Sequence, residues 1–324
     1  MEALIANYKD IITNGVNQLS AYAEPKGLYE PIHYLMSLGG KRIRPAVVLM
    51  AAELYDKDPN EVVSAAIALE VFHNFTLMHD DIMDKAPLRR GKTTVHEKWD
   101  LNTAILSGDG MMIIANKLLE SVDNVYYKQV MQLFNQTALE VCEGQQFDMD
   151  FELRNDVSHQ EYINMIRLKT SVLLACCFQM GALLGGANKD DQAHLYHFGE
   201  LLGIAFQLKD DWLDVFGDSA KVGKQAGGDI LANKKTYLLI RALEKANGTQ
   251  LDNINNWLSI NDNPTEKVTA ITQLFFELEI DKETEQEIDQ YYQKALGHLE
   301  DINLSDEKKE VLRNFAANLM GRTY

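Results

Sequence analysis

Helix-start signals recur along the chain, each ahead of an apolar segment with helical spacing. Asp58, Pro59 and Glu61 form one of them, because aspartate can cap free N–H groups, proline fits the first turn and a glutamate three residues after the cap completes a capping box. Ser158 and Glu161 repeat this device ahead of a second segment. Runs of alternating β-branched residues between hairpin turns are missing. We therefore predict an all-α fold of roughly ten or more helices.

The size and composition of the chain favour a single folded unit. Of its 324 residues, 46% are hydrophobic, which is enough to bury a large core. No linker rich in Pro, Gly or Ser divides the sequence, and the polar stretch 246–257 is a candidate loop or short helix. We predict one domain that spans residues 1–324.

The charge balance argues against nucleic-acid or lipid-surface partners. The formal net charge is −17, with 48 acidic residues against 31 basic ones, and such a surface repels phosphate backbones and anionic membranes.

The cysteines lack the spacing of a metal site, and the first residues lack the pattern of a signal peptide. No apolar run approaches the ~20 residues that span a bilayer. We therefore expect a cytoplasmic protein with no membrane insertion.

Two aspartate clusters with the same DDxxD spacing close two of the predicted helices, in HDDIMD and KDDWLD. Asp80 and Asp84 are four residues apart and share one helix face, and so do Asp210 and Asp214. The remaining members lie about 100° round the helix from their neighbours: Asp81 and Asp211. Carboxylates with no His or Cys nearby suit a hard cation, magnesium above all. A solvated acidic helix end would explain one cluster, whereas the matched pair favours magnesium sites.

Basic residues gather at four places in this acidic chain. They are Lys41, Arg42 and Arg44 in GGKRIRP, Arg89 and Arg90 after the first aspartate cluster, Lys169 beside Thr170, and Lys224, Lys234 and Lys235 in a glycine-rich stretch. Each group alone is compatible with ordinary surface. Together they indicate that the protein binds two anionic groups. One would be bound through metal and lysine, and the other by direct contacts with Lys and Arg. The GxxxxGK[ST] phosphate loop does not occur, so a nucleotide is not the obvious ligand.

Taken together, these segments resemble the trans-isoprenyl diphosphate synthase, or polyprenyl synthetase, family. The matching segments are GGKRIRP, HDDIMDKAPLRRG, the KT pair, FQLKDDWLD and GGDILANKKT, which occur in the family's order across residues 39–236. The resemblance implies an isoprenoid synthase fold, in which helices surround a deep central cavity, and normally a homodimer. It also implies a magnesium-dependent prenyltransferase that condenses isopentenyl diphosphate with an allylic diphosphate: dimethylallyl, geranyl or farnesyl.

The same resemblance assigns roles to individual residues. It implies that Asp80 and Asp84 are ligands of two magnesium ions and Asp210 of a third, with supporting places for Asp81, Asp211 and Asp214. The allylic diphosphate would be held by Arg89, Lys169, Lys224 and Lys234, with Lys235 as the alternative to Lys234. Isopentenyl diphosphate would be held by Lys41, Arg44, His73 and Arg90. Beside the developing carbocation would lie Thr170 and Gln207.

On this assignment the chemistry follows from charge. Magnesium and basic side chains would neutralise the leaving diphosphate, so that the carbon–oxygen bond ionises to an allylic cation. The double bond of isopentenyl diphosphate attacks this cation, a proton leaves, and the product is five carbons longer. A cavity with apolar walls would exclude the water that otherwise traps the cation.

Product length in this family depends on side chains that precede the first aspartate motif. Bulky residues four and five positions before it generally stop chain growth early. Here these positions hold Thr76 and Phe75, with Phe72 one turn earlier. This pattern resembles synthases that make the 20-carbon geranylgeranyl product more than long-chain synthases. We expect geranylgeranyl diphosphate as the product, with farnesyl diphosphate next.

Two other functions share part of this pattern. A terpene cyclase also ionises an allylic diphosphate, but its second metal motif is normally an Asn/Ser/Glu pattern and it needs no second diphosphate site. An inactive relative that serves as a regulatory or partner subunit usually lacks an aspartate from one motif, whereas both motifs are complete here. We therefore favour an active synthase.

Overall fold

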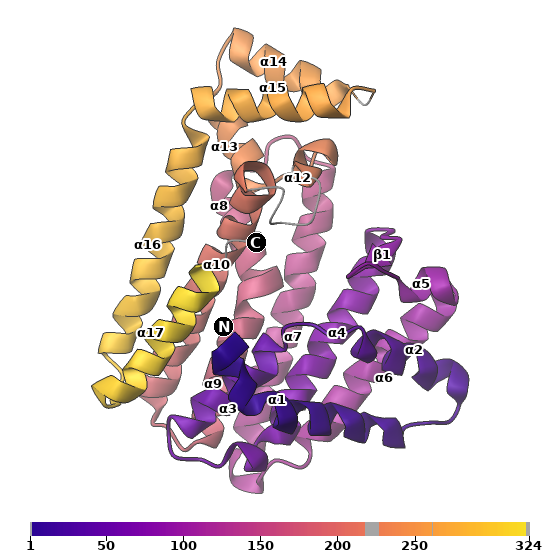
Figure 1. Ribbon diagram of the computed structural model, residues 1–324, viewed down its shortest axis with the longest axis vertical. Helices are drawn as coiled ribbons and strands as arrows, with labels where there is room; N and C mark the ends of the chain where they lie inside the picture. The colour runs from indigo at the N-terminus through magenta and orange to yellow at the C-terminus, as the bar shows by residue number, and fades with distance from the viewer. Residues whose placement is uncertain (1, 218–226, 261, 322–324) are drawn as a thin grey trace. The chain divides into compact units, whose positions relative to one another are not determined.

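Helices make up most of the protein. The computed structural model describes residues 2–217, 227–260 and 262–321 (Figure 1). Within these ranges the only sheet is a short antiparallel hairpin of β1 (Leu88–Arg89) and β2 (Lys92–Thr93). The predicted all-α fold is confirmed.

The chain divides into two compact units. The first comprises residues 1–135 and 176–193, and the second comprises residues 136–175 and 194–324. The assignment of a single domain to the whole chain stays a prediction.

The first unit is built around α3 and α4, which carry much of its apolar core. Its elements are α1 (Glu2–Asn17), η1 (Gln18–Ala21), α2 (Lys26–Ser37), α3 (Ile43–Glu53), η2 (Pro59–Glu61), α4 (Val63–Met83), the hairpin, α5 (Val95–Lys98), α6 (Leu101–Leu119) and parts of α7 (Asn124–Glu152), α9 (Val172–Leu184) and α10 (Lys189–Phe216). Gly181 lets α9 approach α3 closely, because a Cβ there would lie 2.3 Å from the carbonyl oxygen of Val48. This close packing leaves Val47, Val48 and Leu49 with no exposed surface.

The second unit contains the remaining helices. They are α8 (His159–Ile166), the π-helical turn η3 (Arg167–Ser171), α12 (Gly228–Leu231), α13 (Tyr237–Lys245), α14 (Thr249–Ser259), α15 (Pro264–Glu277), α16 (Ile280–Glu300) and α17 (Asp306–Met320), with the rest of α7, α9 and α10. One apolar cluster joins α8, α10 and α13 through Tyr162, Leu208 and Ile240. Another joins α14 and α15 through Ile254 and Phe275.

The two predicted capping boxes have different outcomes. Ser158 caps α8 as expected, because its hydroxyl accepts from Glu161 N and its own N–H donates to the Glu161 carboxylate at 2.9 Å. Asp58 instead caps the 3₁₀ turn η2, and Glu61 forms an ion pair with a lysine. The long helix α4 therefore begins only at Val63.

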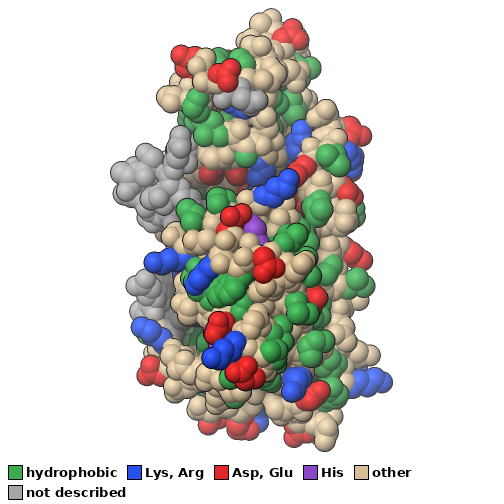
Figure 2. Space-filling view, turned by 90° about the vertical axis from the view of Figure 1, so that its right-hand side faces the viewer, with side chains coloured by type: hydrophobic (Ala, Val, Ile, Leu, Met, Phe, Trp, Pro, Cys, Tyr) green, Lys and Arg blue, Asp and Glu red, His purple; other side chains and the backbone are tan. Residues whose placement is uncertain are grey.

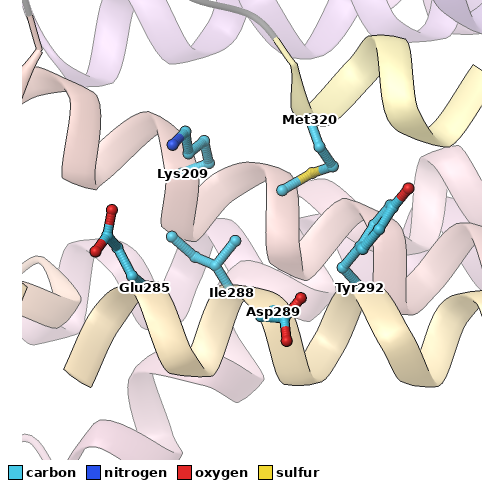
Figure 3. A pocket seen from close by; sticks show the side chains of 6 residues that line it. All are labelled: Lys209, Glu285, Ile288, Asp289, Tyr292 and Met320. Carbon is cyan, nitrogen blue, oxygen red and sulfur yellow. The ribbon is translucent and has the colours of Figure 1, made fainter. Parts of the chain in front are cut away.

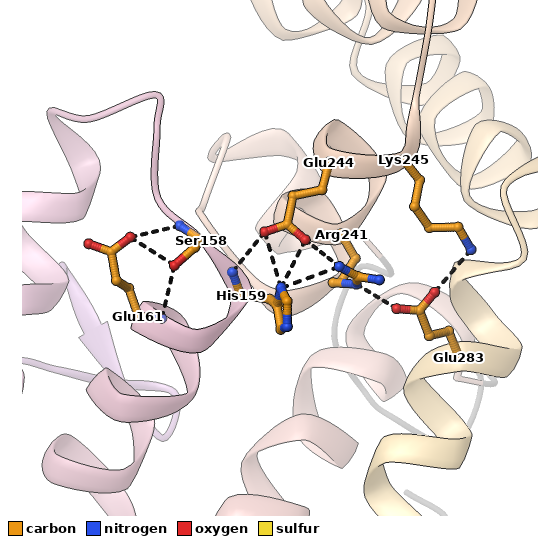
Figure 4. A network of polar contacts seen from close by, with 7 residues as sticks. All are labelled: Ser158, His159, Glu161, Arg241, Glu244, Lys245 and Glu283. Carbon is orange, nitrogen blue, oxygen red and sulfur yellow. Dashed lines mark hydrogen bonds and ion pairs between the residues drawn. The ribbon is translucent and has the colours of Figure 1, made fainter.

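A polar network joins α8, α13 and α16 in the second unit (Figure 4). Glu244 accepts from His159 Nδ1 at 2.9 Å and also pairs with Arg241. Glu283 accepts from Arg241 Nε at 2.5 Å and from Lys245 Nζ at 2.9 Å. Because these side chains keep partial contact with solvent, each pair adds modestly to stability, but together they fix the three helices side by side.

One helical stretch, residues 159–184, has the length and composition to cross a membrane, with a mean hydropathy of 1.3 in its most apolar window. The sequence analysis expected no such run. Since 78% of that window is buried in the protein, the stretch has the character of a core helix. The surface in Figure 2 mixes acidic, basic and hydrophobic side chains.

Candidate active site

The first aspartate cluster lies at the C-terminal end of α4. Asp84 caps the helix, and its N–H donates to the carbonyl of Asp80 at 2.8 Å. Asp81 is only 2% exposed, and its two carboxylate oxygens accept from Arg89 Nε at 2.8 and 2.9 Å. Arg89 therefore neutralises the buried member of the cluster. On the shared helix face, Asp80 is half-buried and Asp84 is exposed.

Arg90 joins the β1–β2 turn to the glycine loop ahead of α3. Gly39 and Gly40 have φ angles of +75° and +136°, which side-chain-bearing residues rarely adopt. The Arg90 guanidinium donates to the carbonyl oxygen of Gly39. A Cβ on Gly40 would lie 2.9 Å from a guanidinium nitrogen of Arg90. The two glycines thus make the space in which Arg90 lies beside the loop that carries Lys41.

Arg44 and His73 form the next part of this basic site. Arg44 NH1 lies 3.1 Å from His73 Nε2. Burial, followed by the charges of Arg44, Arg90 and Arg89, holds the pKa of His73 well below its usual range. The imidazole is therefore neutral, so Nε2 accepts from Arg44 and the ring proton is on Nδ1.

The Nε atom of Arg44 is buried and has no hydrogen-bond partner within the described ranges. A buried guanidinium donor without a partner is costly unless an anion or water satisfies it. Arg42, by contrast, is held by the buried Glu70 and by the carbonyl oxygen of Met36 at 2.5 Å. The first unit thus brings together Arg44, His73, Arg89 and Arg90, and the Nε donor of Arg44 has no protein partner in the described ranges.

Lys169 and Thr170 lie in the π-helical turn η3 of the second unit. Such turns are rare and are often found at functional sites. Lys169 Nζ donates to Asp148 on α7 at 2.5 Å. Gly144 allows this contact, because a Cβ there would lie 2.2 Å from the backbone nitrogen of Lys169.

The segment GQQFDMD on α7 was missed in the sequence analysis. It supplies Gly144 and Asp148, and it also supplies Gln145, whose amide nitrogen and oxygen are buried with no partner in the described part of the chain. A glycine inside a strongly helical segment, followed by acidic residues, was the available signal.

The second aspartate cluster ends α10. Asp211 is 3% exposed and accepts from Tyr162 Oη at 2.5 Å and from Gln207 Nε2 at 3.2 Å. Burial raises the pKa of Asp211 to about 7, against the opposing effects of Tyr162 and the Lys234 charge. Asp214 accepts from the backbone N–H of Asp229 at 3.0 Å, while its carbonyl accepts from Gly227 N at 2.7 Å, so the start of α12 is held against this cluster.

The three lysines predicted after α10, namely Lys224, Lys234 and Lys235, have different outcomes. Lys224 lies outside the described residues. Lys235 Nζ donates to Asn155 Oδ1 at 3.0 Å, whereas the charge of Lys234 acts on Asp211. This placement favours Lys234 over Lys235 as the side chain directed toward the aspartate cluster.

The donor set of the two clusters fits magnesium. No group of three or more His, Cys, Asp or Glu side chains in residues 2–217, 227–260 and 262–321 is arranged to hold a metal ion by itself. Magnesium does not need such a group, because it takes one or two carboxylates and completes its shell with water and substrate phosphates. Asp80 with Asp84, and Asp210 with Asp214, provide this kind of partial shell.

The predicted chain-length residues lie in the first unit, one to two turns before the first cluster. Phe72 is 1% exposed and packs against Phe75, with ring centroids 5.7 Å apart, and against Phe134, at 5.3 Å. Thr76 donates its hydroxyl to the carbonyl oxygen of His73 at 2.8 Å. Phe134, on α7, is thus a second aromatic layer behind Phe72 that the sequence analysis did not identify.

A cavity of about 230 Å³ in the second unit has none of the predicted site residues in its lining (Figure 3). Glu285, Ile288, Asp289 and Tyr292 line it from α16, with Lys209 from α10 and Met320 from α17. Its mixed charges do not resemble a diphosphate site.

Comparison with known proteins agrees with these features. The family model described as polyprenyl synthetase matches residues 25–275. A geranylgeranyl diphosphate synthase from Methanosarcina mazei is 42% identical over 250 residues, which is 76% of each chain. A crystal structure of a geranylgeranyl pyrophosphate synthase has a TM-score of 0.94 with this chain at 46% identity and covers 99% of both chains. A geranylgeranyl pyrophosphate synthase from Corynebacterium glutamicum, solved with isoprenyl diphosphate and magnesium, has a TM-score of 0.87 at 27% identity and covers 99% of both chains.

Proposed function

This chain belongs to the polyprenyl synthetase family and is a short-chain trans-prenyltransferase with the isoprenoid synthase fold, and we propose that its main product is geranylgeranyl diphosphate. The substrates would be isopentenyl diphosphate and an allylic diphosphate: dimethylallyl, geranyl or farnesyl. Farnesyl diphosphate is the second candidate product. The observation that carries the proposed use of isopentenyl diphosphate is the basic site around His73, where the buried Arg44 Nε has no partner in the described chain.

The basic site would hold isopentenyl diphosphate. Arg44, Arg90 and Lys41 supply charge, and the neutral His73 holds the Arg44 guanidinium in place through a 3.1 Å contact. Guanidinium forks suit the planar, bidentate recognition of phosphate oxygens. A terpene cyclase needs no such second anion site, which favours chain elongation.

The aspartate clusters and the nearby basic residues would hold the allylic diphosphate. Asp80, Asp84 and Asp210 are the proposed ligands of three magnesium ions, with supporting places for Asp81, Asp211 and Asp214. Bound magnesium would neutralise the charge that develops on the departing diphosphate. The same diphosphate would be held by Arg89, Lys169, Lys224 and Lys234. Two carboxylates support this set of basic residues. Asp81 positions Arg89, and Asp148 positions Lys169.

Thr170 and Gln207 would lie beside the developing cation. Both belong to the second unit, with Lys169 directly before Thr170 in the π-helical turn and Gln207 one turn before Asp211. Their side-chain oxygens would stabilise the positive charge on carbon without acting as strong nucleophiles.

The aromatic residues of α4 support a product of limited length. Phe72 and Phe75 pack together, and Phe134 closes the far side of Phe72. A growing chain that follows α4 away from Asp80 would meet this aromatic layer within two helical turns. The relatives named geranylgeranyl diphosphate synthase support the same length.

A homodimer in the cytoplasm is part of the proposal. On α6, a row of large apolar side chains is 41–61% exposed: Leu101, Ile105, Leu106 and Ile113. Apolar surface of this kind on one helix is typical of protein interfaces. A second copy of the chain is the partner we propose for it.

A product assay tests the proposed function. Purified protein is incubated with magnesium, isopentenyl diphosphate and a 5-, 10- or 15-carbon allylic starter, and the products are separated by chromatography. Linear products that end at 20 carbons would support the proposal, and a cyclic hydrocarbon would support the cyclase alternative. No product from any starter would identify the chain as an inactive partner subunit.

A further inference from the structure

Three histidines meet where α10 and α16 lie together in the second unit, away from every residue used in the proposed reaction. His194 and His197 are on α10, and His298 is on α16. The Nδ1 atoms of His194 and His298 are 3.1 Å apart. The ring centroids of His197 and His298 are 5.2 Å apart.

The 3.1 Å separation is close to that of two ligands on one metal ion. Two imidazole nitrogens bound to a tetrahedral ion at 2.0–2.1 Å are roughly 3.3 Å apart. In the absence of metal, one of the two Nδ1 atoms must donate a proton to the other. If that proton moves to Nε2 of its own ring, both Nδ1 lone pairs become available to a cation and no proton is released.

The surroundings of His298 favour its uncharged form. Burial, followed by His197 and His194, lowers the pKa of His298, against the opposing charges of Asp301 and Glu200. Glu200 also accepts from Arg167 at 3.1 Å and pairs with His197 at 3.4 Å. Neutral imidazole is the form that binds metal, so the lowered pKa of His298 favours binding through that ring at neutral pH.

We propose that His194 and His298 chelate one divalent transition-metal ion of the zinc, nickel and copper class through their Nδ1 atoms. Water would complete the shell, because no group of three or more metal-holding side chains occurs in the described ranges. Imidazole nitrogen suits these ions and not magnesium, so the site is chemically distinct from the aspartate clusters. A bound ion joins α10 to α16 and stabilises the folded chain.

Metal binding to the full chain tests this site. The protein is freed of metal with a chelator, given excess magnesium to occupy the carboxylates, and then titrated with Ni²⁺ or Cu²⁺. We expect one ion per chain, a rise in Tm of about 2 °C or more, and nitrogen hyperfine splitting in the Cu²⁺ electron paramagnetic resonance spectrum. Binding should weaken in acid, because metal ions bind only the deprotonated ring nitrogen.

Two variants and one matched control decide the result. His194→Gln and His298→Gln should each lose the Tm rise and the nitrogen signal while keeping prenyltransferase activity. His33→Gln should keep both signals, because His33 lies in the first unit and bonds to the carbonyl of Leu19. Equal Ni²⁺ binding in the wild type and both cluster variants, or no binding in any of them, would overturn the proposal. Neither result bears on the product assay, so the two proposals can fail separately.

Discussion

Replacing Gly144 with alanine should damage the candidate active site through the backbone. The new Cβ would lie 2.2 Å from the nitrogen of Lys169 and 2.7 Å from the carbonyl carbon of Leu168. Ordinary contact begins at 3.4 Å, so α7 and η3 would have to separate by about 1.2 Å at this point. Backbone atoms cannot rotate away as a flexible side chain can. The strain would therefore displace the turn that carries Lys169 and Thr170.

Two opposing free energies set the stability of this variant. Alanine in a helix interior gains about 1 kcal/mol over glycine, whereas overpacking costs about 1–3 kcal/mol. We expect a net loss of about 0–2 kcal/mol in the free energy of unfolding. A displacement of about 1 Å at a reacting centre can reduce the rate by roughly 10²-fold, so kcat should fall much more than stability does.

The assay compares kcat and urea unfolding of Gly144→Ala with those of Gly297→Ala. Gly297 lies in α16 with nothing within 4 Å of its would-be Cβ, so its alanine variant should gain about 0.5–1 kcal/mol and keep full activity. If Gly144→Ala behaved in the same way, the close approach of α7 and η3 would not be what positions Lys169, and the reasoning would be refuted.

Three further substitutions have expected outcomes. Asp80→Ala should abolish turnover while the far-ultraviolet circular dichroism spectrum stays helical; retained activity would exclude Asp80 as a metal ligand. Phe75→Ala should lengthen the product in the chromatographic assay, and an unchanged product would show that another side chain stops chain growth. Glu70→Ala should lower the free energy of unfolding by about 3 kcal/mol or more, because it leaves Arg42 without its buried partner, whose side chain is 4% exposed; a loss below about 1 kcal/mol in urea unfolding would show that the pair is weak.

Local sequence signals predicted the parts of the fold that depend on local contacts. The Ser158 capping box and the helical spacing ahead of Asp80 are both present. The α-helix start predicted at Asp58 is a 3₁₀ turn in the structure, because both kinds of helix can begin with the same aspartate cap.

Partners that are distant in the sequence were not predictable in this way. Lys169 donates to Asp148, which is 21 residues away in the sequence. Asp211 accepts from Tyr162, which is 49 residues away. Neither pair follows from helical spacing, because each depends on how two helices pack. The π-helical turn at Lys169 is likewise visible only in the folded chain.

The neutral His73 has a consequence for behaviour in acid. Burial and the charges of four arginines lower the pKa of this imidazole well below its usual value, so acidification through the normal titration range of histidine does not protonate it. Guanidinium groups do not titrate there either. The charge of the proposed isopentenyl diphosphate site is therefore constant when the surroundings turn mildly acidic. A loss of affinity in that range is expected from protonation of the substrate's own phosphate oxygens, which reduces its negative charge.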